Sequence, residues 1–198
     1  MKIIFIGAHV DDIELTCGGT LSKYRDNEIY IYAFSDCNES NKGFNLIDEF
    51  HNSMNVLKPK EYKLYNFPVR TFNKFRQDIL EVLVNISKTV KPDMVFFHSE
   101  NDIHQDHNVI YNECRRAFNN TSMLTYNLPK NSTNSIGNYI VKLSKRDLEF
   151  KLKLLNCYKS QFNKFYFNYK SIKAEMIINA MQVGGGYAEK YNVIKLIK

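Results

Sequence analysis

Short runs of apolar residues alternate along the chain with longer stretches of mixed polarity. The runs are nearly continuous in apolar character, which is typical of strands buried on both faces of a parallel sheet; they cover residues 2–7, 28–34, 62–67 and 93–98. The stretches between them place apolar residues three or four positions apart, as helices do; the expected helices open near Gly18-Gly19-Thr20 and then cover 46–57, 72–89 and 107–118. This alternation predicts βαβ units and an α/β fold with a mostly parallel sheet.

The pattern is less regular in the last third of the chain. The remaining expected elements are strands at 123–127 and 139–143, a helix capped by Ser144 that runs to about Gln161, and a helix at 172–181. The polar loop at 129–137 is a candidate for the rim of a site. The aromatic segment 162–169 is expected to pack in the core, with a sugar-stacking platform as the alternative. Three glycines at 184–186 predict a turn, because they lack the strand-to-helix context of a phosphate-binding loop.

Length and composition indicate one globular domain that covers residues 1–198. Of the 198 residues, 44% are hydrophobic and 24% charged, which is enough to enclose one core, and there is no linker or internal repeat. No apolar stretch approaches the roughly 20 residues that span a bilayer, and the apolar start is too short for a signal peptide. Four scattered cysteines without a C-x-x-C pair are expected to be reduced thiols in a cytoplasmic protein.

The chain is basic, with a formal net charge of +6 and an isoelectric point near 9.0. This charge is compatible with an anionic partner, such as nucleic acid, a nucleotide-linked sugar or a membrane surface. The basic residues are interleaved with acidic ones, and no nucleic-acid-binding motif is present. We therefore do not expect the protein to bind nucleic acid. A transient contact with a membrane surface stays open, and the sequence does not determine the oligomeric state.

Two clusters of histidine and aspartate each follow a predicted strand. The first is His9-Val10-Asp11-Asp12, directly after the strand at 2–7, and the second is His104-Gln105-Asp106-His107, shortly after the strand at 93–98. Open α/β sheets bind their ligands beyond the carboxyl ends of the strands, where both clusters fall. We therefore expect the two clusters to form one shared site.

The residue types of the clusters suit a catalytic metal centre. Zinc and similar cations take imidazole nitrogen and carboxylate oxygen, and a catalytic site supplies three protein ligands and leaves a position for water. His9, Asp12 and His107 would fill the three ligand positions. The adjacent Asp11 would then accept a proton from a water molecule whose pKa the cation lowers. Such a constellation is hydrolytic.

The second cluster offers two more candidates for chemistry. His104, as an imidazolium, could stabilise an oxyanion and protonate a departing amine, and Asp106 could orient an imidazole. Taken singly, each residue has an ordinary explanation, since a histidine at a strand end is often only hydrogen-bonded and an Asp pair often only caps a helix. Three of the five histidines gathered after two strands favour the metal site. The other two, His51 and His98, are not assigned to it.

The clusters resemble the motifs of the PIG-L/LmbE-like family of zinc-dependent de-N-acetylases, which read Ala-His-Pro-Asp-Asp-Glu and His-Pro-Asp-His. The matching segments are Ala8-His9-Val10-Asp11-Asp12-Ile13-Glu14, continued by Leu15-Thr16-Cys17-Gly18-Gly19-Thr20-Leu21, and His104-Gln105-Asp106-His107. Weaker similarity extends the resemblance over nearly the whole chain, through Glu49 and residues 66–70, 158–161 and 187–189. Val10 and Gln105 replace the two prolines, and Ile13 displaces the glutamate to Glu14.

The resemblance implies a Rossmann-like fold in a single domain, with a mostly parallel sheet flanked by helices. It also implies zinc held by His9, Asp12 and His107, with Asp11 as general base and His104 assisting the tetrahedral intermediate. Fe²⁺, Co²⁺ and Mn²⁺ are the alternative metals for ligands of these types.

The resemblance further implies an N-acetylglucosamine-type conjugate as substrate. Arg70 matches a substrate-contacting arginine of the family, although the aspartate usual after the preceding proline is lacking. We therefore expect a metal-dependent hydrolase that removes an N-acetyl group from an amino sugar or sugar conjugate and releases acetate. A hydrolase of another amide, and a metal-containing carbohydrate-binding protein without turnover, are the alternatives.

Overall fold

The computed structural model describes residues 1–37, 45–132, 134 and 137–198, and within these residues seven strands form one sheet in the order β3-β2-β1-β4-β5-β7-β6. Five strands are mutually parallel: β1 (Lys2–His9), β2 (Glu28–Ser35), β3 (Glu61–Leu64), β4 (Met94–His98) and β5 (Ser122–Tyr126). The expected α/β fold with a mostly parallel sheet is confirmed. β6 (Tyr139–Leu143) and β7 (Tyr187–Lys195) add an antiparallel edge.

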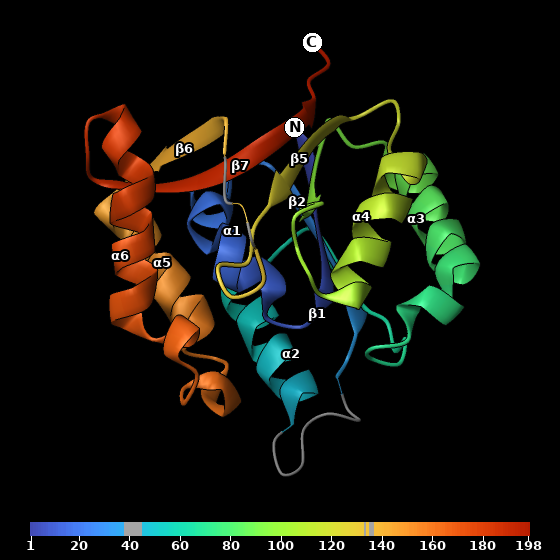
Figure 1. The fold of residues 1–198 in the computed structure, drawn as a ribbon, viewed down its shortest axis with the longest axis horizontal. Coiled ribbons are helices and arrows are strands. Elements are labelled where there is room, and N and C mark those ends of the chain that lie inside the picture. The colour runs from blue at the N-terminus through green and yellow to red at the C-terminus, as the bar shows by residue number, and fades with distance from the viewer. Residues whose placement is uncertain (38–44, 133, 135–136) are drawn as a thin grey trace.

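Helices cover both faces of this sheet (Figure 1). One face carries α1 (Asp12–Lys23), α2 (Leu46–Leu57), α5 (Lys145–Leu155) and α6 (Tyr169–Ala180), and the other carries α3 (Arg76–Val90) and α4 (Gln105–Ala117). Strand β1 contributes apolar side chains to the hydrophobic cores on both faces of the sheet. Ile3 and Phe5 belong to one core, and Ile4, Ile6 and Ala8 belong to the other. Side chains alternate along a strand, so a continuous apolar run fills two cores.

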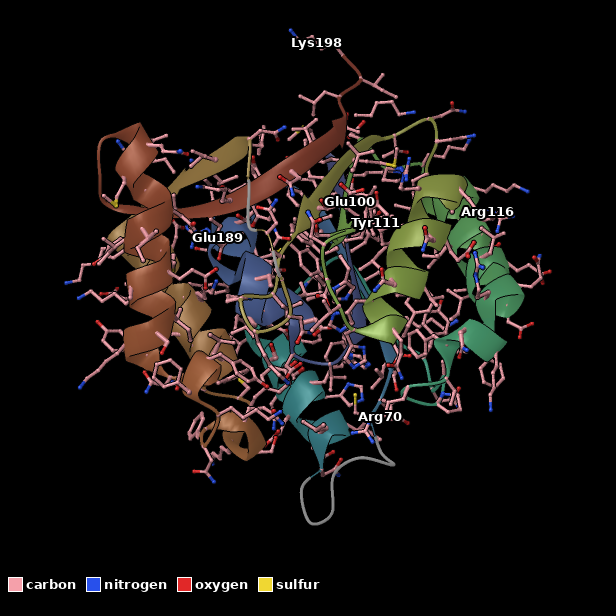
Figure 2. All side chains as sticks on the ribbon, in the orientation of Figure 1. Arg70, Glu100, Tyr111, Arg116, Glu189 and Lys198 are labelled. Atoms are coloured by element: carbon pink, nitrogen blue, oxygen red, sulfur yellow. The ribbon has the colours of Figure 1, made fainter. Side chains whose placement is uncertain are left out.

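Strand β7, which the sequence pattern does not predict, lies between β5 and β6 and is antiparallel to both. It contains Glu189, a charged residue of which only 3% is exposed. The Glu189 carboxylate accepts hydrogen bonds from Lys151 Nζ on α5 and from the backbone N–H of Thr20 on α1, each at 2.7 Å, which places it between these elements (Figure 2). Glu189 can be buried because Lys151 and Thr20 are its partners, and these residues lie far away in the sequence. A charged residue at a buried position interrupts the apolar pattern of β7, so the sequence does not predict this strand.

Helix α1 begins at Asp12, before the glycine pair where the sequence suggests an opening, so Gly18 and Gly19 lie inside the helix. A Cβ atom at Gly18 would lie 2.7 Å from Lys151 Cγ, and one at Gly19 would lie 2.5 Å from Leu143 Cδ1. The two glycines therefore allow α5 and β6 to approach α1 more closely than any other residue would.

Other boundaries differ by a few residues from those expected. Helix 72–89 is a 3₁₀ turn, η2 (Phe72–Lys74), followed by α3, and the helix capped by Ser144 ends at Leu155 before η3 (Lys159–Gln161). The closing helix α6 is flanked by η4 (Phe165–Phe167) and η5 (Met181–Val183). The glycines 184–186 all have positive φ and turn the chain into β7.

The aromatic segment 162–169 packs in the core only in part. Phe167 is buried and Tyr166 half-buried, whereas Phe165 is 81% exposed. Among the described helices, none combines the length and the apolar character needed to cross a membrane.

Candidate metal and catalytic site

The candidate site lies at the carboxyl ends of β1 and β4, two adjacent strands near the centre of the sheet. The chain continues from β1 into α1 on one face and from β4 into α4 on the other (Figure 1). Such a switch point opens a crevice at the edge of a parallel sheet. His9 is the last residue of β1, and His107 lies in the first turn of α4, so the two sequence clusters meet in this crevice.

The turn between β1 and α1 places two carboxylates next to each other. Asp11 has a left-handed backbone with φ of 88°, which is uncommon for a residue other than glycine. Asp12 then starts α1, and its carboxylate accepts a hydrogen bond from the His9 backbone N–H at 2.8 Å. The strained turn is held at both ends by this bond and by the helix, as is typical of functional sites.

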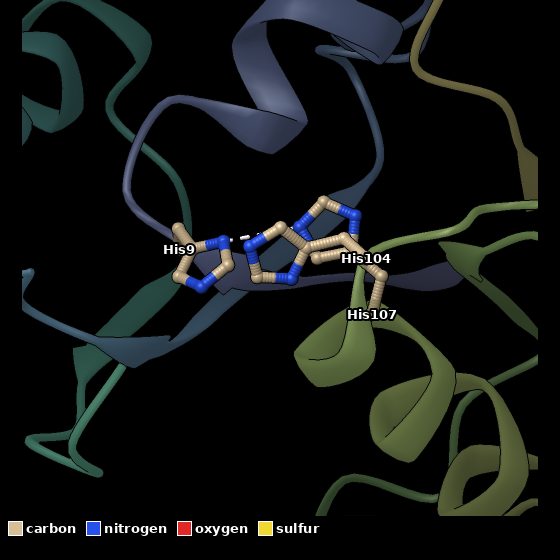
Figure 3. A group of neighbouring side chains, drawn as sticks. All are labelled: His9, His104 and His107. Carbon is tan, nitrogen blue, oxygen red and sulfur yellow. Dashed lines mark hydrogen bonds between the residues drawn. The ribbon is translucent and has the colours of Figure 1, made fainter. Parts of the chain in front are cut away.

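The three predicted metal ligands bring their donor atoms together. His9 Nδ1 lies 3.0 Å from His107 Nε2 (Figure 3). Asp12 Oδ2 lies 3.5 Å from the first of these nitrogens and 3.6 Å from the second. Ligand atoms at about 2.1 Å from a tetrahedral zinc ion lie about 3.4 Å from one another. The three atoms therefore have the spacing of three corners of a tetrahedral site.

Each of the two imidazoles has a carboxylate at its other nitrogen. His9 Nε2 lies 3.1 Å from Asp106 Oδ2, and His107 Nδ1 lies 2.7 Å from Asp102 Oδ2. An ionised carboxylate only accepts hydrogen bonds, so these two nitrogens carry the protons. In the neutral rings, His9 Nδ1 and His107 Nε2 are then left as acceptors that face each other and the Asp12 carboxylate. A positive charge between these acceptors stabilises the group, and either a proton on His9 or a metal cation can supply it.

Burial and neighbouring charges set the protonation of these groups. Burial lowers the pKa of His107 to about 4. Burial also acts to lower the pKa of His9, but hydrogen bonds with Asp106 and Asp12 raise it to about 10. Burial alone would raise the pKa of Asp12, yet His107 and His98 hold it well below its ordinary value. A proton on His9 and a metal cation compete for the same position, so metal binding must release that proton.

Two other combinations of side chains come within metal-binding range in the described part of the chain. Ligand atoms lie within 4.8 Å of one another in His9, His104 and His107 and in Asp12, His98 and His107. His98 does not fit a ligand role, because its Nε2 accepts a hydrogen bond from the Ala8 backbone N–H at 2.9 Å. The buried His98 ring instead stacks on His107, with the ring centroids 3.8 Å apart.

Asp11 and His104 line the cavity beside the predicted ligands. Burial and the adjacent Asp12 raise the pKa of Asp11, while Lys164 acts in the opposite direction; a raised pKa makes a carboxylate a stronger base. The Asp106 backbone N–H donates to His104 Nδ1 at 3.2 Å, so a neutral ring has its proton on Nε2. Burial lowers the pKa of His104. The structure thus favours a neutral His104 that donates through Nε2, where the sequence suggests an imidazolium.

Asp106 is fully buried and orients His9 rather than His104. Its carboxylate also accepts hydrogen bonds from the backbone N–H groups of Arg70 at 2.6 Å and Phe72 at 3.3 Å. Arg70 thus contacts the site through its backbone, a contact that the sequence does not predict. Its exposed side chain lines the cavity at the end of the molecule opposite the C-terminus (Figure 2).

A cavity of about 370 Å³, a volume typical of small-molecule sites, contains the candidate site. The predicted residues that line it are His9, Asp11, Asp12, Arg70, His104 and His107. Gln161, Lys164 and Tyr166 come from the segment between α5 and α6. The polar loop 129–137, expected at the rim, contributes Lys130 and Asn131. Its residues 133, 135 and 136 lie outside the described residues.

Asp102 and His98 are site residues to which the sequence analysis gives no role. Asp102 is 2% exposed and accepts hydrogen bonds from the His104 backbone N–H at 2.9 Å and from His107 at 2.7 Å. Its position two residues before the second cluster is the available sequence signal. For His98 the signal is its place at the end of a buried strand, directly beside the strand that carries the first cluster.

Comparisons with known proteins agree with this fold. A family model described as PIG-L, GlcNAc-PI de-N-acetylase, matches residues 4–118. The uncharacterized deacetylase YaiS of Escherichia coli strain K12 is 32% identical over 117 residues, which cover 55% of this chain and 63% of YaiS, less than two thirds of its length.

Two solved structures share the fold over nearly the whole chain. The conserved protein TT1542 from Thermus thermophilus superimposes with a TM-score of 0.82 at 19% identity and covers 99% of this chain and 96% of its own. The N,N'-diacetylchitobiose deacetylase from Pyrococcus horikoshii superimposes with a TM-score of 0.78 at 19% identity, over 98% of this chain and 83% of its own.

Proposed function

The chain belongs to the PIG-L family of deacetylases, and we propose that it is a metal-dependent hydrolase that removes an N-acetyl group from an amino sugar or sugar conjugate and releases acetate. The observation that carries this proposal is the convergence of His9 Nδ1, His107 Nε2 and Asp12 Oδ2, three potential ligand atoms within 3.6 Å of one another. The chitobiose deacetylase with the same fold acts on an N-acetylated amino sugar, which supports this choice of substrate class.

His9, Asp12 and His107 would hold the metal. A bound cation supplies Lewis acidity, which polarises the amide carbonyl and lowers the pKa of water. We propose zinc, because two imidazoles and a carboxylate suit it, with Fe²⁺, Co²⁺ and Mn²⁺ as the alternatives for these ligands.

The residues around the ligands would carry the proton transfers. Asp11 accepts a proton from the attacking water, a task for which its raised pKa suits it. His104 donates a hydrogen bond from its Nε2–H to the amide oxygen as negative charge develops there. The proton held by Asp11 then passes to the amide nitrogen and the C–N bond breaks. The products are the free amine and acetic acid, which loses the second proton of the water molecule to become acetate. Asp106 keeps His9 in the required tautomer, and Arg70 contacts the substrate from the cavity wall.

We also propose a cytoplasmic location. Cys17, Cys114 and Cys157 are thiols outside any disulfide in the described part of the chain, which suits a reducing compartment. The proposed partner is a small amino-sugar conjugate and not a nucleic acid.

The test is acetate release from a panel of N-acetylated amino sugars, offered free, nucleotide-linked and lipid-linked to protein of defined metal content. We expect release that stops when a chelator removes the metal and returns when zinc is added. Stoichiometric metal without acetate release across the panel would overturn the proposal. Release of another acid from a different amide would keep the proposed hydrolytic reaction but assign it to another class of substrate.

A further inference from the structure

Two lysines meet over one aromatic ring at the wall of the cavity. Lys130 follows β5, and Lys164 lies between α5 and α6, so distant parts of the chain supply them. Lys130 Nζ lies 5.2 Å from the centroid of the Tyr166 ring, and Lys164 Nζ lies 5.8 Å from the same centroid. The ring attracts both ammonium groups and leaves each of them with its positive charge.

In the described part of the chain, neither lysine forms a close ion pair with a carboxylate. Within the described residues, neither Nζ atom has a carboxylate oxygen within 4.0 Å. The acidic residues in the described cavity wall are Asp11 and Asp12, both of which have tasks in the proposed reaction. Two like charges held near one ring repel each other unless an anion lies between them. The arrangement therefore favours a ligand with negative charge.

The lysines are also close to the reacting centre. Both lysines and Tyr166 line the same cavity as Asp11 and Asp12. A group held by the lysines would thus be part of the same molecule as the amide that reacts. In a 2-acetamido sugar, the carbon that bears the acetamido group adjoins the anomeric carbon, which bears the conjugate.

We infer that Lys130, Lys164 and Tyr166 form a subsite for an anionic group, a phosphate or carboxylate, carried by the substrate next to its acetamido group. This inference rests on the proposed deacetylase function and adds a substrate class to it. Neutral amino sugars and neutral oligosaccharides would then be poor substrates. Lys130 and Lys164 are exposed and contribute to the net positive charge of the chain, so they would also attract an anionic substrate toward the cavity.

Matched substrates test the inference. N-acetylglucosamine 1-phosphate and the methyl glycoside of N-acetylglucosamine, in the same anomeric form, differ in one charged group. Charge-assisted hydrogen bonds at a partly exposed site predict kcat/KM about tenfold higher for the phosphate. This preference is expected to shrink as the salt concentration rises, since salt screens exposed charges. Equal kcat/KM for the two substrates would overturn the inference.

Lys130→Gln is the informative variant, because Lys164 also acts on Asp11. We expect it to lose most of the preference for the phosphate, with a larger loss on the phosphate ester than on the neutral glycoside. Lys173→Gln is the matched control, since Lys173 Nζ lies 5.7 Å from the Tyr169 ring but does not line the cavity. The control is expected to keep the wild-type preference. An equal loss on both substrates in Lys130→Gln would show a structural effect and contradict the subsite.

Binding separates this inference from the proposed reaction. The proposed function fails only if no sugar of the whole panel is hydrolysed, and calorimetry of N-acetylglucosamine 1-phosphate against the neutral glycoside still tests the subsite in that case. Weaker binding of the phosphate to Lys130→Gln, with unchanged binding to Lys173→Gln, supports the subsite. Unchanged binding to both variants overturns it.

A third arm of the experiment offers a lipid-linked amino-sugar phosphate in phosphatidylcholine vesicles. A Lys130→Gln loss confined to this arm identifies a lipid headgroup as the anion, and a loss in the soluble arm identifies a free ester.

Discussion

Replacing Asp102 by asparagine tests how the site holds its metal. The two carboxylate oxygens accept separate hydrogen bonds, from His107 Nδ1 at 2.7 Å and from the His104 backbone N–H at 2.9 Å. Asparagine has one carbonyl oxygen and one NH₂ group, so it can serve only one of the two donors. It also removes the negative charge that makes His107 a stronger ligand.

The expected loss in metal affinity is about 10- to 100-fold, the range found for such outer partners of metal-binding histidines. This equals about 1.4–2.7 kcal/mol, since each factor of ten corresponds to about 1.4 kcal/mol. The assay is a competition between the protein and a chelator of known zinc affinity, with the thermal transition of the same samples recorded to show that the variant is folded.

Glu113→Gln is the control for loss of a buried carboxylate. Glu113 lies on α4, the helix that also carries His107, is fully buried, and accepts hydrogen bonds from Arg76 and Arg116. Its loss is expected to lower the thermal transition without changing the zinc dissociation constant. A folded Asp102→Asn protein with wild-type zinc affinity would refute the orienting role that we assign to Asp102.

Three further outcomes are expected. Asp11→Asn should keep its metal and lose about 10²- to 10⁴-fold in kcat, whereas His107→Ala should lose metal affinity. Metal analysis after dialysis measures the metal content of both variants, and equal metal loss in both would make Asp11 a ligand. Because the pKa of His9 is raised to about 10, its extra proton must leave when metal binds, so zinc affinity should rise about tenfold per pH unit between pH 7 and 9. Calorimetry in buffers of different ionisation enthalpy counts the released proton, and a pH-independent affinity would contradict the protonation of His9. Gly19→Ala should destabilise the fold by about 1–3 kcal/mol, because its Cβ would lie 2.5 Å from Leu143 Cδ1; an unchanged denaturation midpoint would show that α1 can shift freely.

The sequence predicts those parts of the molecule that local patterns encode. The strands before His9 and His104 are continuous apolar runs, and a cluster of histidine and aspartate follows directly after the first and shortly after the second. The fold class and the location of the candidate site can therefore both be predicted from the sequence. The helix at Leu46–Leu57 and the strand at Tyr139–Leu143 have the expected bounds for the same reason. Local patterns are sufficient to predict an element when one of its sides faces the core and the residues that follow it are polar or turn-forming.

The missed features depend on contacts between distant residues. Asp102 gains its role only when α4 brings His107 beside it, and His98 only when β1 lies alongside β4. The protonation of His104 likewise follows from burial and from a backbone N–H, neither of which the sequence displays. Strand β7 is missed because the burial of Glu189 is made favourable by Lys151 on another element.

The position of β7 also governs how this protein can fold during its synthesis. Every residue proposed to bind metal or move protons has been synthesised once His107 is made, yet β6 cannot join the sheet until β7 has been made and lies between it and β5. Until then the growing chain presents the unpaired edge of β5, and the backbone of α1 lacks Glu189. Open edges of this kind attract other chains. We therefore expect nascent chains that stall before residue 187 to be inactive, prone to aggregation and dependent on chaperones.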